Sequence, residues 1–209
     1  MVFLIDFDNT LSNNDDLKNE LKDALDSVLG KEETQQFWLF HDEFRDHEKL
    51  VEFPFIIRDY CKKVYTETWE TKLIEIFNNI KVKDCLYTKA VEVLTHLKSL
   101  GKVYIFTEGD LDFQKAKVNK SGLEKYVDGV YVFDYKMEKF KYIIDLLNDK
   151  ITIYIDDKTY NLAQAKEAVP TVKTVWVRQG YYKDVLAINP DNIDKIVNSL
   201  DELLTHDFS

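Results

Sequence analysis

Two hydrophobic patterns divide this chain. Short apolar runs bounded by polar residues occur at 2–5 and recur between residues 103 and 177, where they alternate with stretches whose apolar residues repeat every three or four positions. Residues 13–84 show the helical repeat alone. Short apolar runs predict buried strands, and a repeat near 3.6 predicts amphipathic helices. The chain is therefore predicted to combine an α/β part with an all-helical part.

The α/β part should form one parallel sheet. Strands are predicted at 2–5, 103–106, 130–133, 151–155 and 172–177, and helices at 89–100, 112–121, 138–148, 159–168 and 192–205. Gly101 and Gly122 directly follow two of these helices, as glycine often does where a helix ends. Strands that alternate with helices predict a parallel sheet covered by helices on both faces.

The segment between the first strand and this alternation is predicted to be helical. Its helices should run from 14 or 15 to 29, from 32 to 49, from 54 to 65 and from 69 to 80. Asn14 or Asp15 is the expected N-cap of the first helix, and Gly30 its end. We therefore expect an α/β core made of residues 1–12 and 85–209, and a small helical domain made of residues 13–84.

Composition and charge narrow the class of protein. Hydrophobic residues make up 45% of the 209 residues, enough for one full core and a small second module. A net charge of −10 argues against binding to nucleic acid or to an anionic membrane. No apolar stretch approaches the roughly 20 residues of a membrane helix. Cys61 and Cys85 lack metal-type spacing, which favours reduced thiols in a cytoplasmic protein. No pattern predicts an oligomeric state.

Polar residues suited to phosphate and metal follow four of the predicted strands. Asp6 and Asp8 follow the first strand and, two residues apart on an extended backbone, point the same way. The next strands are followed by Thr107 with Gly109, by Lys136, and by the pair Asp156 and Asp157. Each has an ordinary explanation, such as a turn or a helix cap. Four together at the edge where α/β sheets bind ligands favour a functional site.

With these residues in place, the chain resembles the haloacid dehalogenase (HAD) superfamily. Its first motif is matched by Asp6, Asp8 and Thr10, its second by Thr107, its third by Lys136, and its fourth by Asp156 and Asp157. The resemblance implies a Rossmann-like α/β core with a helical C1-type cap at 13–84. A mobile lid over the site is favoured over a bundle that merely extends the core, because the insert directly follows the first strand's active edge.

The resemblance implies a phosphatase that uses Mg²⁺ and acts on a small phosphorylated metabolite. Asp6 would attack phosphorus and form an aspartyl-phosphate, and Asp8 would protonate the leaving oxygen and then activate water. Asp8 favours phosphate esters over haloacids, because carbon–halogen cleavage by the family's dehalogenases needs no acid at this position. Mg²⁺ would be held by Asp6, Asp8, Asp156 and Asp157, and the phosphate would be bound by Thr107, Gly109 and Lys136.

Several alternatives stay open. Lys139 competes with Lys136 as the phosphate lysine, and Met137 replaces the proline that often follows the family's lysine. Lys136 is preferred because it comes sooner after the strand. Whether Asp156 or Asp157 binds metal directly is not decided by the sequence. The alternatives in function are a phosphomutase or other phosphotransferase of the same fold, and a catalytically silent binding module. Thr10 favours a phosphatase, because it is commoner there within the family.

Overall fold

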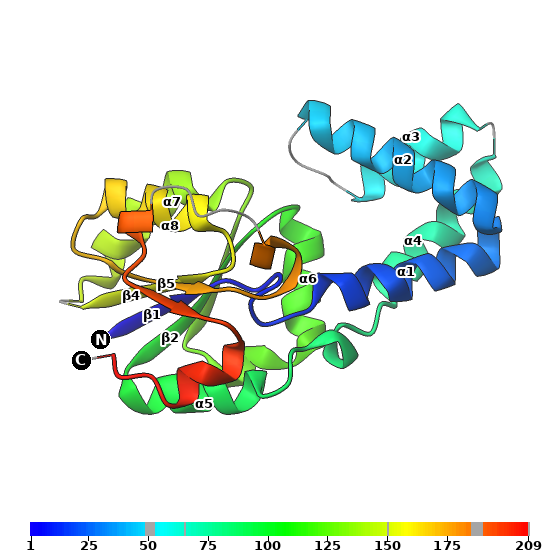
Figure 1. Cartoon of the computed structure of the whole chain (residues 1–209). Coiled ribbons are helices and arrows are strands. Elements are labelled where there is room, and N and C mark those ends of the chain that lie inside the picture. Colours follow the sequence, from blue (N-terminus) through cyan, green and yellow to red (C-terminus); the bar gives the residue numbers. More distant parts are fainter. Residues whose placement is uncertain (49–52, 65, 150, 185–189, 209) are drawn as a thin grey trace.

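The computed structural model describes residues 1–48, 53–64, 66–149, 151–184 and 190–208 (Figure 1). Within these residues, six strands form one sheet in the order β3-β2-β1-β4-β5-β6, and every neighbouring pair is parallel. The strands are β1 (Val2–Ile5), β2 (Lys102–Glu108), β3 (Gly129–Phe133), β4 (Thr152–Asp156), β5 (Lys173–Val177) and β6 (Lys195–Val197). This order is that of doubly wound dinucleotide-binding folds. It confirms the predicted α/β fold with a Rossmann-like sheet.

The central strands are buried on both faces of the sheet. Alternate residues of β1 contribute to different apolar clusters: Phe3 and Ile5 pack on one face, and Val2 and Leu4 on the other. A strand covered on both sides needs apolar residues at every position. The first strand therefore reads as an unbroken apolar run rather than as an alternation.

Helices cover the two faces of the sheet (Figure 1). The face that carries Phe3 packs against α5 (Ala90–Leu100), α6 (Leu111–Ser121) and the 3₁₀ helix η6 (Leu200–Leu204). The opposite face packs against α7 (Lys136–Leu147) and α8 (Thr159–Ala168). Shorter 3₁₀ turns connect these elements: η3 (Leu123–Tyr126), η4 (Gly180–Asp184) and η5 (Pro190–Asn192).

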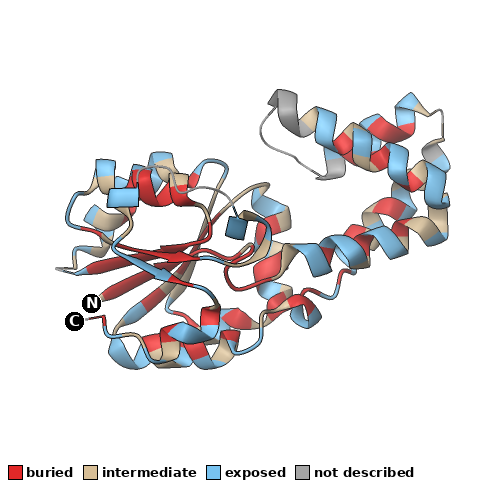
Figure 2. Cartoon of the chain, viewed as in Figure 1, coloured by how far each residue is buried: buried red, intermediate tan, exposed pale blue. Residues whose placement is uncertain are grey.

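The first four α-helices after β1 extend away from the sheet (Figure 1). They are α1 (Asn14–Leu29), α2 (Lys31–Glu48), α3 (Phe53–Lys63) and α4 (Glu70–Asn78), with the 3₁₀ turns η1 (Glu67–Trp69) and η2 (Val82–Cys85). We call this part the helical segment. The predicted ends at 49 and 65 lie outside the described residues. Buried residues form a stripe along these helices (Figure 2), which explains their period in the sequence.

The start of α1 differs from the prediction by one or two residues. Asn13 is the N-cap, and its side chain accepts a hydrogen bond from the backbone N–H of Asp15. Asn14 and Asp15, the predicted caps, are instead the first residues of the helix. Neighbouring Asn and Asp residues are all good caps, so the local sequence did not distinguish them. Gly30 ends the helix as predicted.

The predicted closing helix at 192–205 is wrong. The chain instead forms η5, the short edge strand β6 and η6. Asp194 fixes this path, because its carboxylate accepts hydrogen bonds from the Thr174 backbone N–H (2.7 Å) and hydroxyl (3.1 Å) and pairs with Lys166. These contacts align the following residues with β5, where Lys195 lies beside Val175. Pairing with a distant strand outweighs the local helical period.

Two further features concern the cysteines and the possibility of a membrane-spanning helix. Cys61 and Cys85 are free and buried. None of the described helices combines the length and the apolar character that crossing a bilayer requires.

Candidate functional site

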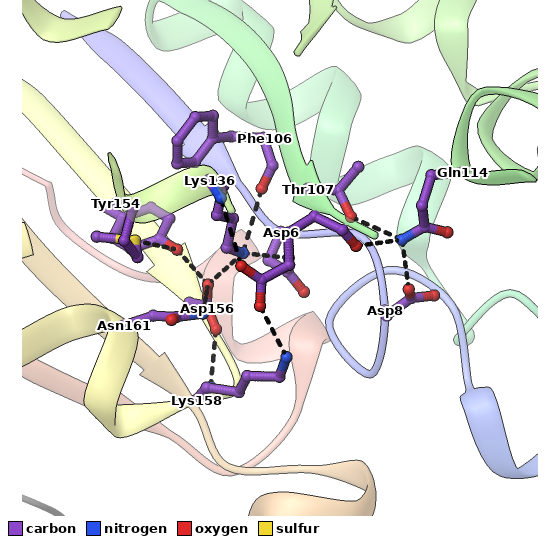
Figure 3. Close-up of polar contacts among 12 residues, drawn as sticks. Asp6, Asp8, Phe106, Thr107, Gln114, Lys136, Tyr154, Asp156, Lys158 and Asn161 are labelled. Atoms are coloured by element: carbon purple, nitrogen blue, oxygen red, sulfur yellow. Dashed lines mark hydrogen bonds and ion pairs between the residues drawn. The ribbon is translucent and has the colours of Figure 1, made fainter. Parts of the chain in front are cut away.

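The carboxyl ends of three neighbouring strands bring the predicted residues together (Figure 3). Ile5 of β1 lies beside Ile105 of β2 and Ile155 of β4. The following residues, among them Asp6 and Asp156, therefore reach the same edge of the sheet. The chain order runs outward in both directions from β1, which makes the boundary between β1 and β4 a topological switch point. Such a point is where open α/β sheets bind ligands.

Three buried carboxylates form a group that could hold a metal ion. Asp6, Asp156 and Asp157 each offer an oxygen, and these oxygens all lie within 4.8 Å of one another. Neither carboxylate oxygen of Asp157 has a hydrogen-bond partner among the described residues, although both are buried. Burial, followed by the charges of Asp156 and Asp6, raises the pKa of Asp157 to about 9. Buried oxygens without partners, in an all-oxygen set, fit a hard divalent cation such as Mg²⁺.

Asp156 differs from Asp157 because its oxygens already have donors. Oδ2 accepts hydrogen bonds from the Tyr154 hydroxyl, Lys136 Nζ (2.7 Å) and Asn161 Nδ2 (3.1 Å). Oδ1 accepts one from the Lys158 backbone N–H (2.8 Å). Burial alone would raise the pKa of Asp156, but these donors, above all Lys136, lower it. Asp156 is thus held as a carboxylate by the protein itself.

Lys136 connects the two strand ends. It is the first residue of α7, its side chain is 1% exposed, and its Nζ donates hydrogen bonds to Asp6 and Asp156 and to the Phe106 carbonyl. Burial would lower its pKa, but Asp156 and Asp6 raise that pKa well above the usual value. Lys139 lies on the exposed side of the same helix. The structure therefore brings Lys136, and not Lys139, to the carboxylates.

The surroundings of Asp6 shift its pKa in both directions. Burial is the largest effect and, with the charge of Asp156, it raises the pKa of Asp6, whereas Lys136 and Lys158 oppose the rise. A bound cation would favour the ionised form.

Asp8 points away from this cluster, toward α6 (Figure 3). Lys117 donates to its Oδ1, and Gln114 Nε2 donates to its Oδ2 at 2.7 Å. Burial would raise the pKa of Asp8, but Lys117 and Gln114 outweigh burial and lower it. The backbone turns sharply just after it, since Asn9 has a φ of 59°. Asp8 is thus an ionised carboxylate beside the metal group rather than a part of it.

Thr107 and Gly109 both lie against the side chain of Gln114. The Thr107 hydroxyl accepts a hydrogen bond from Gln114 Nε2 at 3.1 Å, and the Gly109 N–H donates to the Phe133 carbonyl. A Cβ at position 109 would lie 3.0 Å from Gln114 Cγ. The sequence predicted that Gly109 leaves room for a ligand; in the structure, that room holds Gln114. Thr10 is buried.

Sequence reasoning missed four polar residues of the site: Gln114, Lys117, Lys158 and Asn161. Lys158 lies beside the carboxylates, 3.4 Å from Glu108, and between the rings of Tyr160 and Tyr182. Lys158 and Asn161 closely follow Asp156, so their nearness in sequence was a usable signal. Gln114 and Lys117 are three apart on one helical face, where buried polar residues indicate a functional contact.

The comparisons with a family model and with a solved structure point to the same family. A model of the haloacid dehalogenase-like hydrolases matches residues 1–168. The fold is similar to that of a haloacid dehalogenase-like hydrolase from Burkholderia xenovorans LB400, with a TM-score of 0.86 and 25% identity over 99% of this chain and 98% of that one. No curated protein sequence matches the chain.

More distant structures share the fold. L-2-haloacid dehalogenase from Xanthobacter autotrophicus has a TM-score of 0.63 and 16% identity, over 98% of this chain and 96% of that one. The HAD-hydrolase YfnB from Bacillus subtilis, solved with magnesium, has a TM-score of 0.68 and 17% identity over the same shares. Its crystal structure is described as revealing interdomain movement.

Proposed function

This chain belongs to the haloacid dehalogenase-like hydrolases, and from that premise we propose that it is a Mg²⁺-dependent phosphatase that hydrolyses a small phosphomonoester. The observation that carries the proposal is the carboxylate of Asp8, held by Lys117 and Gln114 next to the Asp6 cluster. An ester oxygen needs a proton to leave, and a second carboxyl group can supply it when protonated.

Asp6 is the proposed nucleophile. Its carboxylate oxygen attacks phosphorus, the bond to the ester oxygen breaks, and an aspartyl-phosphate forms. Lys136, which contacts Asp6, offers positive charge to the phosphoryl oxygens, and the Thr107 hydroxyl can donate to one of them. Both groups are fixed by the sheet edge before the substrate arrives.

Asp8 is the proposed acid and base. Because Asp8 is ionised in the substrate-free site, it must first take up a proton, which the monoanion of the phosphate ester can bring. That proton then goes to the leaving oxygen, which leaves as an alcohol or phenol. The resulting carboxylate then takes a proton from the water that attacks the aspartyl-phosphate. Inorganic phosphate leaves, and Asp6 is restored as a carboxylate. The observed ion pair with Lys117 fits the carboxylate form that starts the second half of this cycle.

The residues at the edge of the sheet fit the expected metal. Asp6 and Asp157 would hold Mg²⁺ directly, since Asp157 has no other partner among the described residues, whereas Asp156 is occupied by four donors. Asp156 would act through Lys136 and as a further acidic neighbour, and Asp8 through its backbone. The ion would supply charge neutralisation for the phosphoryl group and for Asp6.

The helical segment is proposed to be a C1-type cap. It begins soon after Asp8 and ends before α5, and its two connections pair with each other through Ser12 and Leu86, where Ser12 also pairs with Asp8. A cap that covers the site would keep bulk water from the aspartyl-phosphate until Asp8 can use one water molecule. Its inner surface would choose among small phosphorylated metabolites.

The test compares phosphate release with halide release. Purified protein with Mg²⁺ is given 4-nitrophenyl phosphate or 2-chloropropionate. We expect phosphate release that EDTA removes, with no chloride release. Asp6→Asn should lower kcat by about 10⁴-fold or more, because the nucleophile is lost. Asp134→Asn, an exposed change of the same kind, should keep normal rates.

Each other outcome has a clear meaning. Chloride release that needs Asp6 but not Mg²⁺ would make the protein a dehalogenase and refute the proposal. Turnover that survives Asp6→Asn would refute the nucleophile. No phosphate release from any aryl phosphate by folded, Mg²⁺-loaded protein would turn attention to transfer to an acceptor other than water, or to a binding role.

A further inference from the structure

Helix α6 holds both oxygens of one carboxylate. Lys117 donates to Asp8 Oδ1, and Gln114 donates to Asp8 Oδ2 at 2.7 Å. Both residues are buried, and neither has a part in the phosphatase chemistry described above. A buried lysine and a buried amide on one helix, directed at the same side chain, need an explanation beyond packing.

The backbone of Asp8 leaves the orientation of its side chain open. Asp8 lies past the end of β1, where its backbone makes only an isolated bridge with Ser12 among the described pairings. The next residue has positive φ. A short carboxylate in such a turn can adopt several rotamers. Its orientation is therefore set by what its oxygens contact.

Gln114 is itself firmly oriented. The same Nε2 lies 3.1 Å from the Thr107 hydroxyl and 2.9 Å from the Glu108 carbonyl. A flipped amide would turn its oxygen toward the Asp8 carboxylate and the Glu108 carbonyl, which are both acceptors, so the neighbours fix the orientation. Gln114 thereby connects Asp8 to the strand end that carries Thr107.

Lys117 is also confined. Its Nζ lies 5.7 Å from the centre of the Phe7 ring and 5.6 Å from that of Phe113, within the range of cation–π contact. The base of α6 is fixed as well, because the Asp110 carboxylate caps it by accepting from the Phe113 N–H. The ammonium group thus has a defined position relative to β1 and Asp8.

We propose that Lys117 and Gln114 are positioning residues that fix the direction of the Asp8 side chain, so that its protonated form can give a proton to the leaving oxygen. The inference rests on the proposed phosphatase, in which Asp8 is the acid. Proton transfer needs the acid within about 2.6–3.2 Å of the oxygen that receives the proton. An Asp8 free to rotate would meet that requirement in only part of its conformations.

The test uses two substrates whose leaving groups differ in their need for a proton. The 4-nitrophenolate ion leaves readily without one, whereas the phenolate ion from phenyl phosphate leaves poorly. The ratio of kcat/KM for phenyl phosphate to that for 4-nitrophenyl phosphate is measured with Mg²⁺. Because both values come from one preparation, the ratio does not depend on how much of a variant is folded.

Gln114→Met removes the amide donor without changing charge, and Lys117→Met removes the ammonium group. We expect each to lower the ratio by about tenfold, a part of the 10²–10⁴-fold that general acid catalysis commonly supplies. Each change also removes a donor that favours the ionised form of Asp8, so a lower ratio would report lost positioning and not a lost proton. Lys115→Met is the matched control, since Lys115 is exposed on the same helix, and it should leave the ratio unchanged. Asp8→Asn should lower the ratio at least as much as either variant.

The outcomes separate this inference from the function on which it rests. If the wild-type protein hydrolyses both substrates but Gln114→Met and Lys117→Met slow both equally, the two residues have a structural role and the inference is wrong. If the Lys115→Met ratio falls as far as theirs, the effect belongs to the helix and the inference is again wrong. If the wild-type protein hydrolyses neither substrate, the proposed phosphatase fails and the inference falls with it.

Discussion

Asp157 is a buried carboxyl group that has no hydrogen-bond partner among the described residues. Its oxygens have no partner among them, and burial together with Asp156 and Asp6 raises its pKa to about 9. At neutral pH the metal-free site therefore holds a proton that a bound cation would have to displace. Asp157 is thus both a proposed Mg²⁺ ligand and a group that titrates in the metal-free site.

We expect Mg²⁺ binding to release a proton near neutral pH. Affinity should fall by about tenfold for each pH unit below about 9, because one proton competes with the metal. Calorimetry in two buffers with different protonation enthalpies measures the release. Asp157→Asn should weaken binding and remove the pH dependence between about pH 7 and 9, whereas exposed Asp134→Asn should change neither. Affinity that does not vary with pH would contradict the assignment.

The sign of the effect on stability follows from the same pKa. The carboxyl of Asp157 has an ordinary pKa of 3.8 when unfolded and about 9 in the folded metal-free protein. The folded state then binds the proton more tightly than the unfolded chain. The resulting stabilisation is complete below about pH 4 and is lost as the pH rises through about 9. Bound Mg²⁺ would offset this loss.

The sequence could predict the site residues that directly follow strands. It could not predict the site residues that reach the strand ends from helix α6. Asp6 and Asp156 meet because strand ends in a parallel sheet share one edge, and that follows from strand order alone. Gln114 and Lys117 reach Asp8 only because of how α6 is rotated about its axis. That rotation is set by packing across the sheet, which no local pattern records.

At the scale of elements, the turn between β2 and α6 joins the strand to the positioning helix. Gly109 in this turn has a φ of 138°, and a Cβ there would lie 3.0 Å from Gln114 Cγ. Gly122 at the other end of α6 also has positive φ, 71°, but a Cβ there would meet nothing within 4 Å. A side chain at either glycine would strain the backbone, but only a side chain at residue 109 would also displace Gln114.

Gly109→Ala should both destabilise the fold and disturb the site. We expect a loss of about 2–3 kcal/mol in the free energy of unfolding, and lower activity because the new methyl group pushes Gln114 away from Asp8. Gly122→Ala should cost about 1–2 kcal/mol and keep its activity. Urea unfolding and 4-nitrophenyl phosphate hydrolysis measure the two effects. Equal activity in both variants would mean that Gln114 does not depend on the space at residue 109.

The predicted and observed elements agree where local and long-range preferences agree. Helix α8 begins and ends where its apolar period predicted, at 159 and 168, and its apolar side rests on the sheet. The segment 192–205 also has a helical period, but Asp194 binds Thr174 and β6 pairs with β5. A contact between residues 20 positions apart decided this structure. The repeat of apolar residues within one segment cannot reveal a contact with a distant segment.

At the scale of the whole molecule, the helical segment is attached by two short stretches that lie side by side. Ser12 pairs with Leu86, and hydrogen bonds join Asn13 to Cys85 and Tyr87 to Leu11. Beyond this paired base, the segment contacts α6 through Phe77, whose ring lies 6.1 Å from that of Phe113, and through Lys120, which donates to the Asn78 carbonyl. Two connections that pair with each other are suited to hinge motion.

The molecule projects its helices α2 and α3 away from the sheet (Figure 1), so closure of the proposed cap should make it more compact. A compact domain of 209 residues has a radius of gyration of about 17 Å. We expect a larger value with Mg²⁺ alone, and a fall toward 17 Å when beryllium fluoride with Mg²⁺ mimics the phosphorylated Asp6. Small-angle X-ray scattering measures the change, and fluorine NMR reports whether the mimic is bound. Asp6→Asn should show neither binding nor compaction. Bound mimic without compaction would mean that the helical segment is a fixed wall of the site, and that exclusion of water depends on the substrate itself.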